Sequence, residues 1–156
     1  MHIYLWLCND CGVSLYTCSW SKNIDIFNFE KVFFPINISG IHWVLVIALM
    51  QQKRILYRDA LGRDGKKYTS TTLKYLVDES KQLDNDVMNP DDWVVEQIPP
   101  LDSPKQENDS DCGMFVCMYA DYMLQDLPEQ FSQVDMPMLR NKLCCCILEG
   151  QLLYTL

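Results

Sequence analysis

Residues 104–117, PKQENDSDCGMFVC, join a polar loop to an apolar run, and this junction decides the fold. Ser110 or Asp111 can cap a helix by accepting hydrogen bonds from backbone N–H groups, so a helix is predicted to begin near Cys112. Residues 114–124 are apolar on nearly every face, which is typical of a helix buried at the centre of a domain. The stretch therefore predicts one central helix with a cysteine in its first turn.

A cysteine in that position can serve as a nucleophile. The helix dipole and the unpaired N–H groups of the first turn favour a thiolate and also form a pocket for an anion. Most buried cysteines near helix starts are inert small hydrophobic residues, however. From this stretch alone, Cys112 could be a nucleophile or an inert core residue, and the choice depends on the residues elsewhere in the chain.

The segment upstream of the polar loop contains a predicted β-hairpin. Residues 44–50 are uninterruptedly apolar, as in a strand buried on both faces, and residues 54–58 form the second strand. If residues 49–52 make the loop, His42 lies opposite Asp59, about 5 Å away at the backbone. A carboxylate there can orient the imidazole and hold its tautomer. A lone histidine beside an apolar strand is usually only a core residue, and the acidic neighbour favours the catalytic role.

The remaining pattern predicts a single domain of mixed helices and strands. The ordered core is expected to begin near Ile26, which leaves residues 1–25 as a divergent or truncated N-terminal segment and residues 26–156 as the domain. Two further strands are predicted, one over residues 32–38 with Pro35 at an edge or irregular position, and one over 93–98 that includes Trp93 as a core residue. Two further helices are predicted as well. The first is amphipathic and covers 71–83, and the last starts at Asp135 with Pro137 in its first turn and ends at Gly150.

Composition and charge exclude several classes of protein. The net charge of −8 argues against nucleic acid as the main partner, because phosphate binding needs a basic surface. No apolar run reaches the ~18 residues that a membrane span needs. The apolar start of the chain lacks a basic leader, so we expect a protein that is not secreted.

The eight cysteines predict a reducing compartment rather than a disulfide framework. Three of them are consecutive, at 144–146, inside the predicted last helix, where their sulfurs point in three directions and suit packing. Cys8 and Cys11 have the spacing of a zinc knuckle, but only Cys18 and His2 lie near enough to complete such a site. We therefore expect free thiols there and no metal.

Three segments together carry a family resemblance. They are Gly40–Trp43, Tyr57–Gly62, and Gln106 ahead of Asp111–Gly113. In this order the chain resembles the ubiquitin-like-protein-specific cysteine proteases, which deconjugate SUMO (sentrin), from about residue 26 to residue 153. The resemblance implies an α+β papain-like fold, in which a central helix carrying the cysteine packs on an antiparallel sheet.

The resemblance also implies a role for each matching residue. Cys112 would attack the carbonyl of the C-terminal glycine of a ubiquitin-like modifier, and His42 would accept the thiol proton and later protonate the leaving lysine amine. Asp59 would orient His42. Gln106 and the backbone N–H of Cys112 would form the oxyanion hole. Trp43 would cover the diglycine tail, although ordinary core burial would also explain it.

The implied biology is deconjugation and precursor processing of a SUMO-like modifier. The partners would be that modifier and SUMO-conjugated proteins, with no cofactor, a monomeric chain, and a nuclear or cytoplasmic location. Family members have a Trp-Leu-Asn-Asp stretch in a longer N-terminal part. Residues 6–10 match it only loosely, with a cysteine inserted. One alternative is therefore a ubiquitin-like-modifier binding module with impaired catalysis. Another is a redox or zinc protein that uses Cys8, Cys11 and Cys18.

Overall fold

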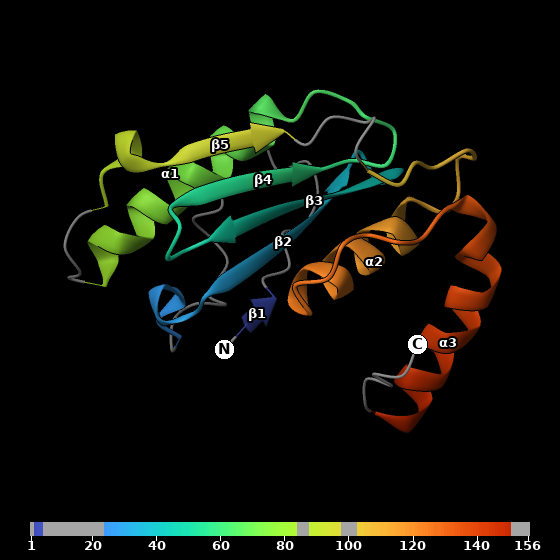
Figure 1. The fold of residues 1–156 in the computed structure, drawn as a ribbon. Coiled ribbons are helices and arrows are strands. Elements are labelled where there is room, and N and C mark those ends of the chain that lie inside the picture. The colour runs from blue at the N-terminus through green and yellow to red at the C-terminus, as the bar shows by residue number, and fades with distance from the viewer. Residues whose placement is uncertain (1, 5–23, 84–87, 98–102, 151–156) are drawn as a thin grey trace.

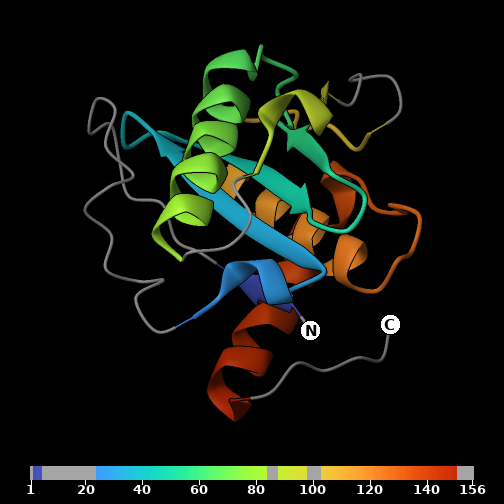
Figure 2. The same ribbon diagram turned by 90° about the vertical axis from the view of Figure 1, so that its left-hand side faces the viewer.

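The structure, a computed structural model, describes residues 2–4, 24–83, 88–97 and 103–150 (Figure 1). A five-stranded sheet in the order β1-β2-β3-β4-β5 has helix α1 on one face and helix α2 on the other (Figures 1 and 2). The described strands and longer helices are β1 (His2–Tyr4), β2 (Lys31–Ile38), β3 (His42–Leu49), β4 (Arg54–Arg58), α1 (Lys66–Gln82), β5 (Val94–Gln97), α2 (Cys112–Leu124) and α3 (Met136–Glu149).

The sheet is antiparallel at its centre and parallel at both edges. β2, β3 and β4 pair antiparallel, as predicted for the sheet, whereas β1 pairs parallel with β2 and β5 pairs parallel with β4. A parallel β4–β5 pair needs a crossover, and α1 supplies it. β1 pairs only with Lys31–Phe33 of β2, so Pro35 lies beyond that ladder, where its missing N–H removes no described bond to β1.

Strand β3 is buried on both faces, as its apolar sequence predicts. Side chains of Leu45, Ile47 and Leu49 pack toward α2 with Phe115. The alternate side chains Val44, Val46 and Ala48 pack toward α1 with Leu76. The two faces follow from the two-residue period of a strand. The first residue of β3, His42, is therefore carried by a strand that is packed on both faces.

The predicted hairpin register is wrong by one residue on each strand. Leu49 pairs with Arg54, and the loop is Met50–Lys53 rather than residues 49–52. The physical reason is that Leu49 is buried toward α2 and stays in the strand, while Lys53 closes the turn with a φ of 50° and donates its N–H to the Met50 carbonyl at 3.3 Å. The shift keeps every side chain on its predicted face, but Asp59 is not directly opposite His42 in the ladder.

Helix α1 begins five residues earlier than the predicted start at residue 71. The polar run from Lys66 to Thr72 carries no apolar stripe, which concealed it. Its hydroxyl groups bond back to carbonyls three or four residues earlier: Thr69 to Gly65, Ser70 to Lys66 and Thr71 to Lys67. These local bonds allow serine and threonine to sit in the first turns of a helix.

The two C-terminal helices begin and end close to the predicted residues, but not with the predicted caps. α2 spans the expected residues, and α3 has Pro137 in its first turn and Gly150 after its end with a φ of 66°. Asp111 and Asp135 occupy the two N-cap positions, yet neither side chain makes a cap bond to its α-helix. Asp135 instead closes a capping box with Ser132 around the short helix η6 (Gln133–Asp135).

Some sequence predictions lie outside the described residues. They include the cysteines at positions 8, 11 and 18 and the segment 6–10. Within the described part, β1 joins residues 2–4 to the same sheet as the predicted domain. Trp93 precedes β5 and is half-buried against the α1 side of the sheet. In the described ranges, none of the helices combines the length and the apolar character that crossing a bilayer would require.

Candidate active site

A buried histidine–carboxylate pair lies at one end of the central strands. His42 Nε2 is 2.8 Å from Asp59 Oδ1, and both side chains are almost fully buried, at 5 % and 1 % exposure. His42 opens β3, and Asp59 follows directly after the last residue of β4. The structure thus brings these two predicted residues into contact through their side chains, beyond the last pair of the β3–β4 ladder, Leu45 and Arg58.

The loop after β4 holds the Asp59 carboxylate in its ionised form. Burial alone would raise the pKa of Asp59, but hydrogen bonds from His42 and from the N–H groups of Leu61 (2.9 Å) and Arg63 (3.1 Å) outweigh it, and the pKa is lowered. An ionised carboxylate can only accept, so Nε2 of His42 donates to it. Nδ1 is then the ring nitrogen left to accept a proton from another group.

Cys112 is the first residue of α2 and is 6 % exposed. A Cβ placed on Gly113 would lie 3.7 Å from Trp43 Cδ1, so the indole ring rests against the start of the helix. The adjacent pairs His42–Trp43 and Cys112–Gly113 therefore meet at this end of the sheet. Among the described residues no hydrogen bond joins the Cys112 thiol to His42, as is common in enzymes before substrate tightens the site.

Gln106 connects the polar loop to the loop that carries Asp59. Its backbone N–H donates to the Ala60 carbonyl at 3.0 Å, and its side chain is buried. The carboxamide nitrogen donates to the Asn108 carbonyl at 2.5 Å, while Oε1 is buried without a partner in the described part of the chain. The predicted oxyanion residue is thus tied by its backbone to the histidine–carboxylate side of the site.

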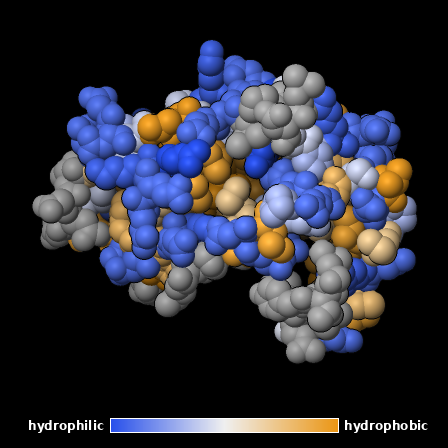
Figure 3. All heavy atoms as spheres, in the orientation of Figure 1, coloured by the Kyte–Doolittle hydropathy of each residue, from blue (hydrophilic) through white to orange (hydrophobic). Residues whose placement is uncertain are grey.

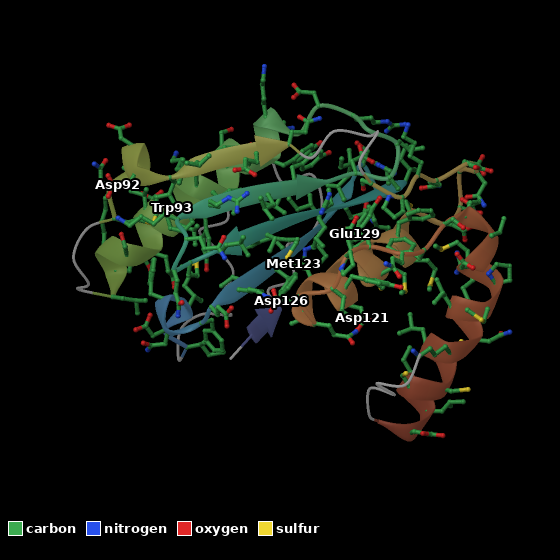
Figure 4. All side chains as sticks on the ribbon, in the orientation of Figure 1. Asp92, Trp93, Asp121, Met123, Asp126 and Glu129 are labelled. Carbon is green, nitrogen blue, oxygen red and sulfur yellow. The ribbon has the colours of Figure 1, made fainter. Side chains whose placement is uncertain are left out.

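The far end of α2 is anchored to the sheet. Lys31 Nζ donates to the Met123 carbonyl at 2.9 Å and pairs with Asp126. Figure 4 shows Met123 and Asp126 at this end of α2, beside β2. The Lys31 side chain is only 3 % exposed, and a cation at a helix C-terminus is favoured by the dipole. These contacts tie the C-terminal end of α2 to β2.

Ile41 presents an apolar side chain next to the site. It is 77 % exposed and directly precedes His42, after a turn in which Gly40 has a φ of 74°. Figure 3 shows hydrophilic atoms over most of the face that carries α2, with hydrophobic atoms in separate patches. The residue that precedes His42 is therefore open to contact from outside the molecule.

Sequence reasoning missed two charged contacts of this region. Asp111 binds Arg140 of α3, and Arg58 forms a buried ion pair with Glu129 at 2.8 Å. Each pair joins residues far apart in sequence, so no local spacing predicts it. The only sequence signal was the placement of Asp111 directly before Cys112, and that signal predicted a helix cap instead.

Comparison with known proteins places these residues in a family. The model of the Ulp1 protease family, C-terminal catalytic domain, matches residues 16–149. Human Sentrin-specific protease 2 is 40 % identical over 134 residues, which are 86 % of this chain and 23 % of that protein. The Sentrin-specific protease of Caenorhabditis elegans is 33 % identical over 138 residues, 88 % of this chain and 19 % of that protein. The chain thus spans less than a quarter of these curated relatives.

Solved structures agree with the sequence matches. The C-terminal Ulp1 protease domain in complex with Smt3, the yeast ortholog of SUMO, superposes with a TM-score of 0.71 at 31 % identity, over 84 % of this chain and 58 % of that one. Ulp1 with its catalytic cysteine oxidized to a sulfonic acid gives 0.70 at 31 % identity, over 83 % and 57 %. These similarities confirm the predicted α+β papain-like fold. The chain belongs to the Ulp1 protease family and matches its C-terminal catalytic domain.

Proposed function

We propose that this chain is a thiol isopeptidase that cleaves after the C-terminal Gly-Gly of a SUMO-like modifier. The observation that carries the proposal is the buried His42–Asp59 pair at 2.8 Å, with Trp43 touching the helix start that bears Cys112. The similarity to a Ulp1 domain that binds Smt3, the yeast ortholog of SUMO, supports this choice of modifier. The substrates would be SUMO-conjugated proteins and modifier precursors.

The chemistry follows from the ring orientation. Cys112 Sγ attacks the glycine carbonyl carbon as its proton passes to Nδ1 of His42, while Asp59 stabilises the imidazolium through Nε2. The C–N bond then breaks as His42 returns the proton to the leaving lysine amine. Water, deprotonated by His42, hydrolyses the thioester that remains on Cys112 and releases the modifier with a free carboxylate.

Two further residues act on the substrate in this scheme. The Gln106 carboxamide and the Cys112 backbone N–H stabilise the oxyanion, and losing one such donor typically lowers the rate by ~10²–10³. Trp43 lies against the backbone at Gly113, and in this scheme its indole ring closes over a narrow channel for the tail of the substrate. The narrow channel would select the diglycine tail.

The decisive experiment is an adduct assay. The protein is mixed with a SUMO carrying an electrophile at its C-terminal glycine, and separately with equivalent probes made from ubiquitin and other ubiquitin-like proteins. We expect a mass shift with SUMO alone, and no shift in Cys112→Ala. A shift with another modifier alone would refute the SUMO assignment. Folded protein that forms no adduct with any probe would refute the enzyme and leave a modifier-binding module.

The remaining properties extend the proposal. We propose a monomer without a cofactor that acts in the nucleus or the cytoplasm and does not bind nucleic acid. The acidic net charge of −8 supports the last point, and the consecutive cysteines at 144–146 suit a reducing compartment. Analytical ultracentrifugation tests the monomeric state, and microscopy of the tagged protein tests the location.

A further inference from the structure

We propose that Asp111 is a positioning residue for the oxyanion hole and that Arg140 of α3 holds it in place. This inference rests on the proposed function, because it assigns an additional residue to the same reaction. Asp111 touches neither substrate nor the reacting atoms in this scheme. It acts on the two donors of the oxyanion hole, Gln106 and the Cys112 N–H.

The Asp111 carboxylate is fully engaged by donors from three parts of the chain. Oδ1 accepts from Arg140 Nε at 3.1 Å and from Arg140 Nη2. Oδ2 accepts from Asn108 Nδ2 at 2.6 Å and from Gln133 Nε2 at 2.7 Å. The side chain is only 10 % exposed, and a buried charge is tolerated when it is paired and hydrogen-bonded in this way.

The hydrogen bonds of Asp111 continue to Gln106, the side-chain donor of the oxyanion hole. Asn108, which donates to Asp111, also accepts through Oδ1 from the backbone N–H groups of Ser110 and Asp111, each at 3.1 Å. The carbonyl of Asn108 accepts from the Gln106 carboxamide. Gln133 adds a second link, since its Oε1 accepts from the Glu107 N–H at 2.9 Å. One network therefore links the polar loop from Gln106 and Glu107, through Asn108, to Ser110 and Asp111.

Both donors of the oxyanion hole depend on this network. The peptide unit that carries the Cys112 N–H begins at the Asp111 carbonyl, so fixing Asp111 fixes the direction of that N–H. The Gln106 carboxamide is placed through Asn108. The Asp111 side chain makes no cap bond, so it does not occupy the first-turn N–H groups of α2. The carboxylate therefore fixes the loop through Arg140, Asn108 and Gln133, and the N–H groups at the start of α2 stay available to an anion.

The test separates oxyanion geometry from thiol chemistry. kcat and KM are measured on a SUMO with a fluorogenic amide at its C-terminus, and the rate of Cys112 alkylation is measured with iodoacetamide. Alkylation displaces iodide without forming an oxyanion, so it does not need the Gln106 and N–H donors. We expect Arg140→Met to lower kcat at least tenfold, with KM and the alkylation rate within about twofold, since small misplacements cost up to ~10² in rate.

Variants on the same network guard against misfolding. Gln133→Ala removes one half-buried donor at the outer end of the network and should lower kcat by a smaller factor in the same direction. Arg140→Lys keeps the charge but loses the two-pronged contact, and it should recover part of kcat. Arg54→Met is the matched control, because it breaks an arginine–carboxylate pair with Glu96 on β4 and β5, and its kcat should equal that of the original chain.

Each outcome decides the inference. Unchanged kcat in Arg140→Met and Gln133→Ala, beside an active original chain, would overturn the role of Asp111 and leave the proposed function intact. A parallel fall of kcat and alkylation would show a general loss of the helix start, which also overturns it. An original chain that is folded and alkylates but turns over no modifier would refute the proposed function, and this inference with it.

Discussion

The buried ion pair between Arg58 and Glu129 gives the sharpest stability prediction. Arg58 Nη2 and Glu129 Oε1 are 2.8 Å apart, and the side chains are 9 % and 10 % exposed. Burial lowers the pKa of Arg58 and raises the pKa of Glu129, so both charges are held at a desolvation cost. Glu129→Gln leaves the guanidinium buried without a counter-charge. We expect it to lower the free energy of unfolding by about 3–5 kcal/mol.

The same strand offers a matched exposed pair. Arg54, four residues before Arg58 on β4, pairs with Glu96, and these side chains are 39 % and 36 % exposed. Exposed pairs of this kind contribute about 0.2–1 kcal/mol. Arg54→Met should therefore lower the free energy of unfolding by less than about 1 kcal/mol, although both substitutions break one arginine–carboxylate contact.

Replacing both buried partners tests the desolvation argument. Arg58 Nε and Nη1 and Glu129 Oε2 are buried without partners in the described part of the chain. These atoms lose their hydration on burial and gain no hydrogen bond in return. The free energy of unfolding of the double variant Arg58→Met/Glu129→Leu should therefore be within about 1 kcal/mol of that of the original chain, or higher. Urea unfolding, followed by tryptophan fluorescence, measures all four proteins. A Glu129→Gln loss no larger than that of Arg54→Met, or a double variant as unstable as Glu129→Gln, would refute the reasoning.

Three further predictions follow from the site and its supports. Asp59→Asn should lower kcat/KM by disturbing the ring of His42, and full activity would remove Asp59 from the site. The same variant should also lose less stability than the original chain below about pH 4. The reason is that folding lowers the pKa of Asp59, so its carboxylate stabilises the fold above its unfolded pKa and loses that contribution as the pH falls through the lower folded pKa. His42→Ala should slow alkylation of Cys112 at neutral pH, since the ring no longer accepts the thiol proton, and an equal rate would contradict the proposed proton transfer. Gly65→Ala places a Cβ 2.3 Å from the Tyr57 ring and should lower the free energy of unfolding by about 1–3 kcal/mol in thermal or urea unfolding, with an unchanged midpoint as the contrary result.

The sequence was most informative where a local pattern has one structural solution. The apolar run of residues 44–50 indicated a strand buried on both faces, which β3 is as far as Leu49, and the Asp-Cys-Gly junction indicated a helix start near Cys112, where α2 begins. His42 and Asp59 could be brought together because a hairpin needs only its loop to set the pairing. That argument survived a one-residue error in the loop because both strands shifted together.

Long-range contacts could not be predicted in the same way. Ser110 or Asp111 was predicted to cap the helix, yet the Asp111 carboxylate binds the guanidinium of Arg140 and two side-chain amides instead. Arg140 brings a full positive charge and a two-pronged contact to the carboxylate, whereas a cap bond would bring it a backbone N–H. The strand over residues 93–98 was predicted and is β5, but the parallel pairing at both edges of the sheet was missed, since a parallel partner is set by a crossover and not by a turn signal.

The antiparallel run from β2 to β4 implies an order of assembly. Each of these strands follows its neighbour through a short loop, so little chain entropy is lost when they pair. α2 comes much later in the chain and must dock across a larger closed loop. We expect pulsed hydrogen-exchange labelling during refolding to protect amides of β3 before those of α2, and simultaneous protection would contradict this order. The base and its carboxylate are then in place before the thiol arrives, so the nucleophile becomes active only in the last step of folding.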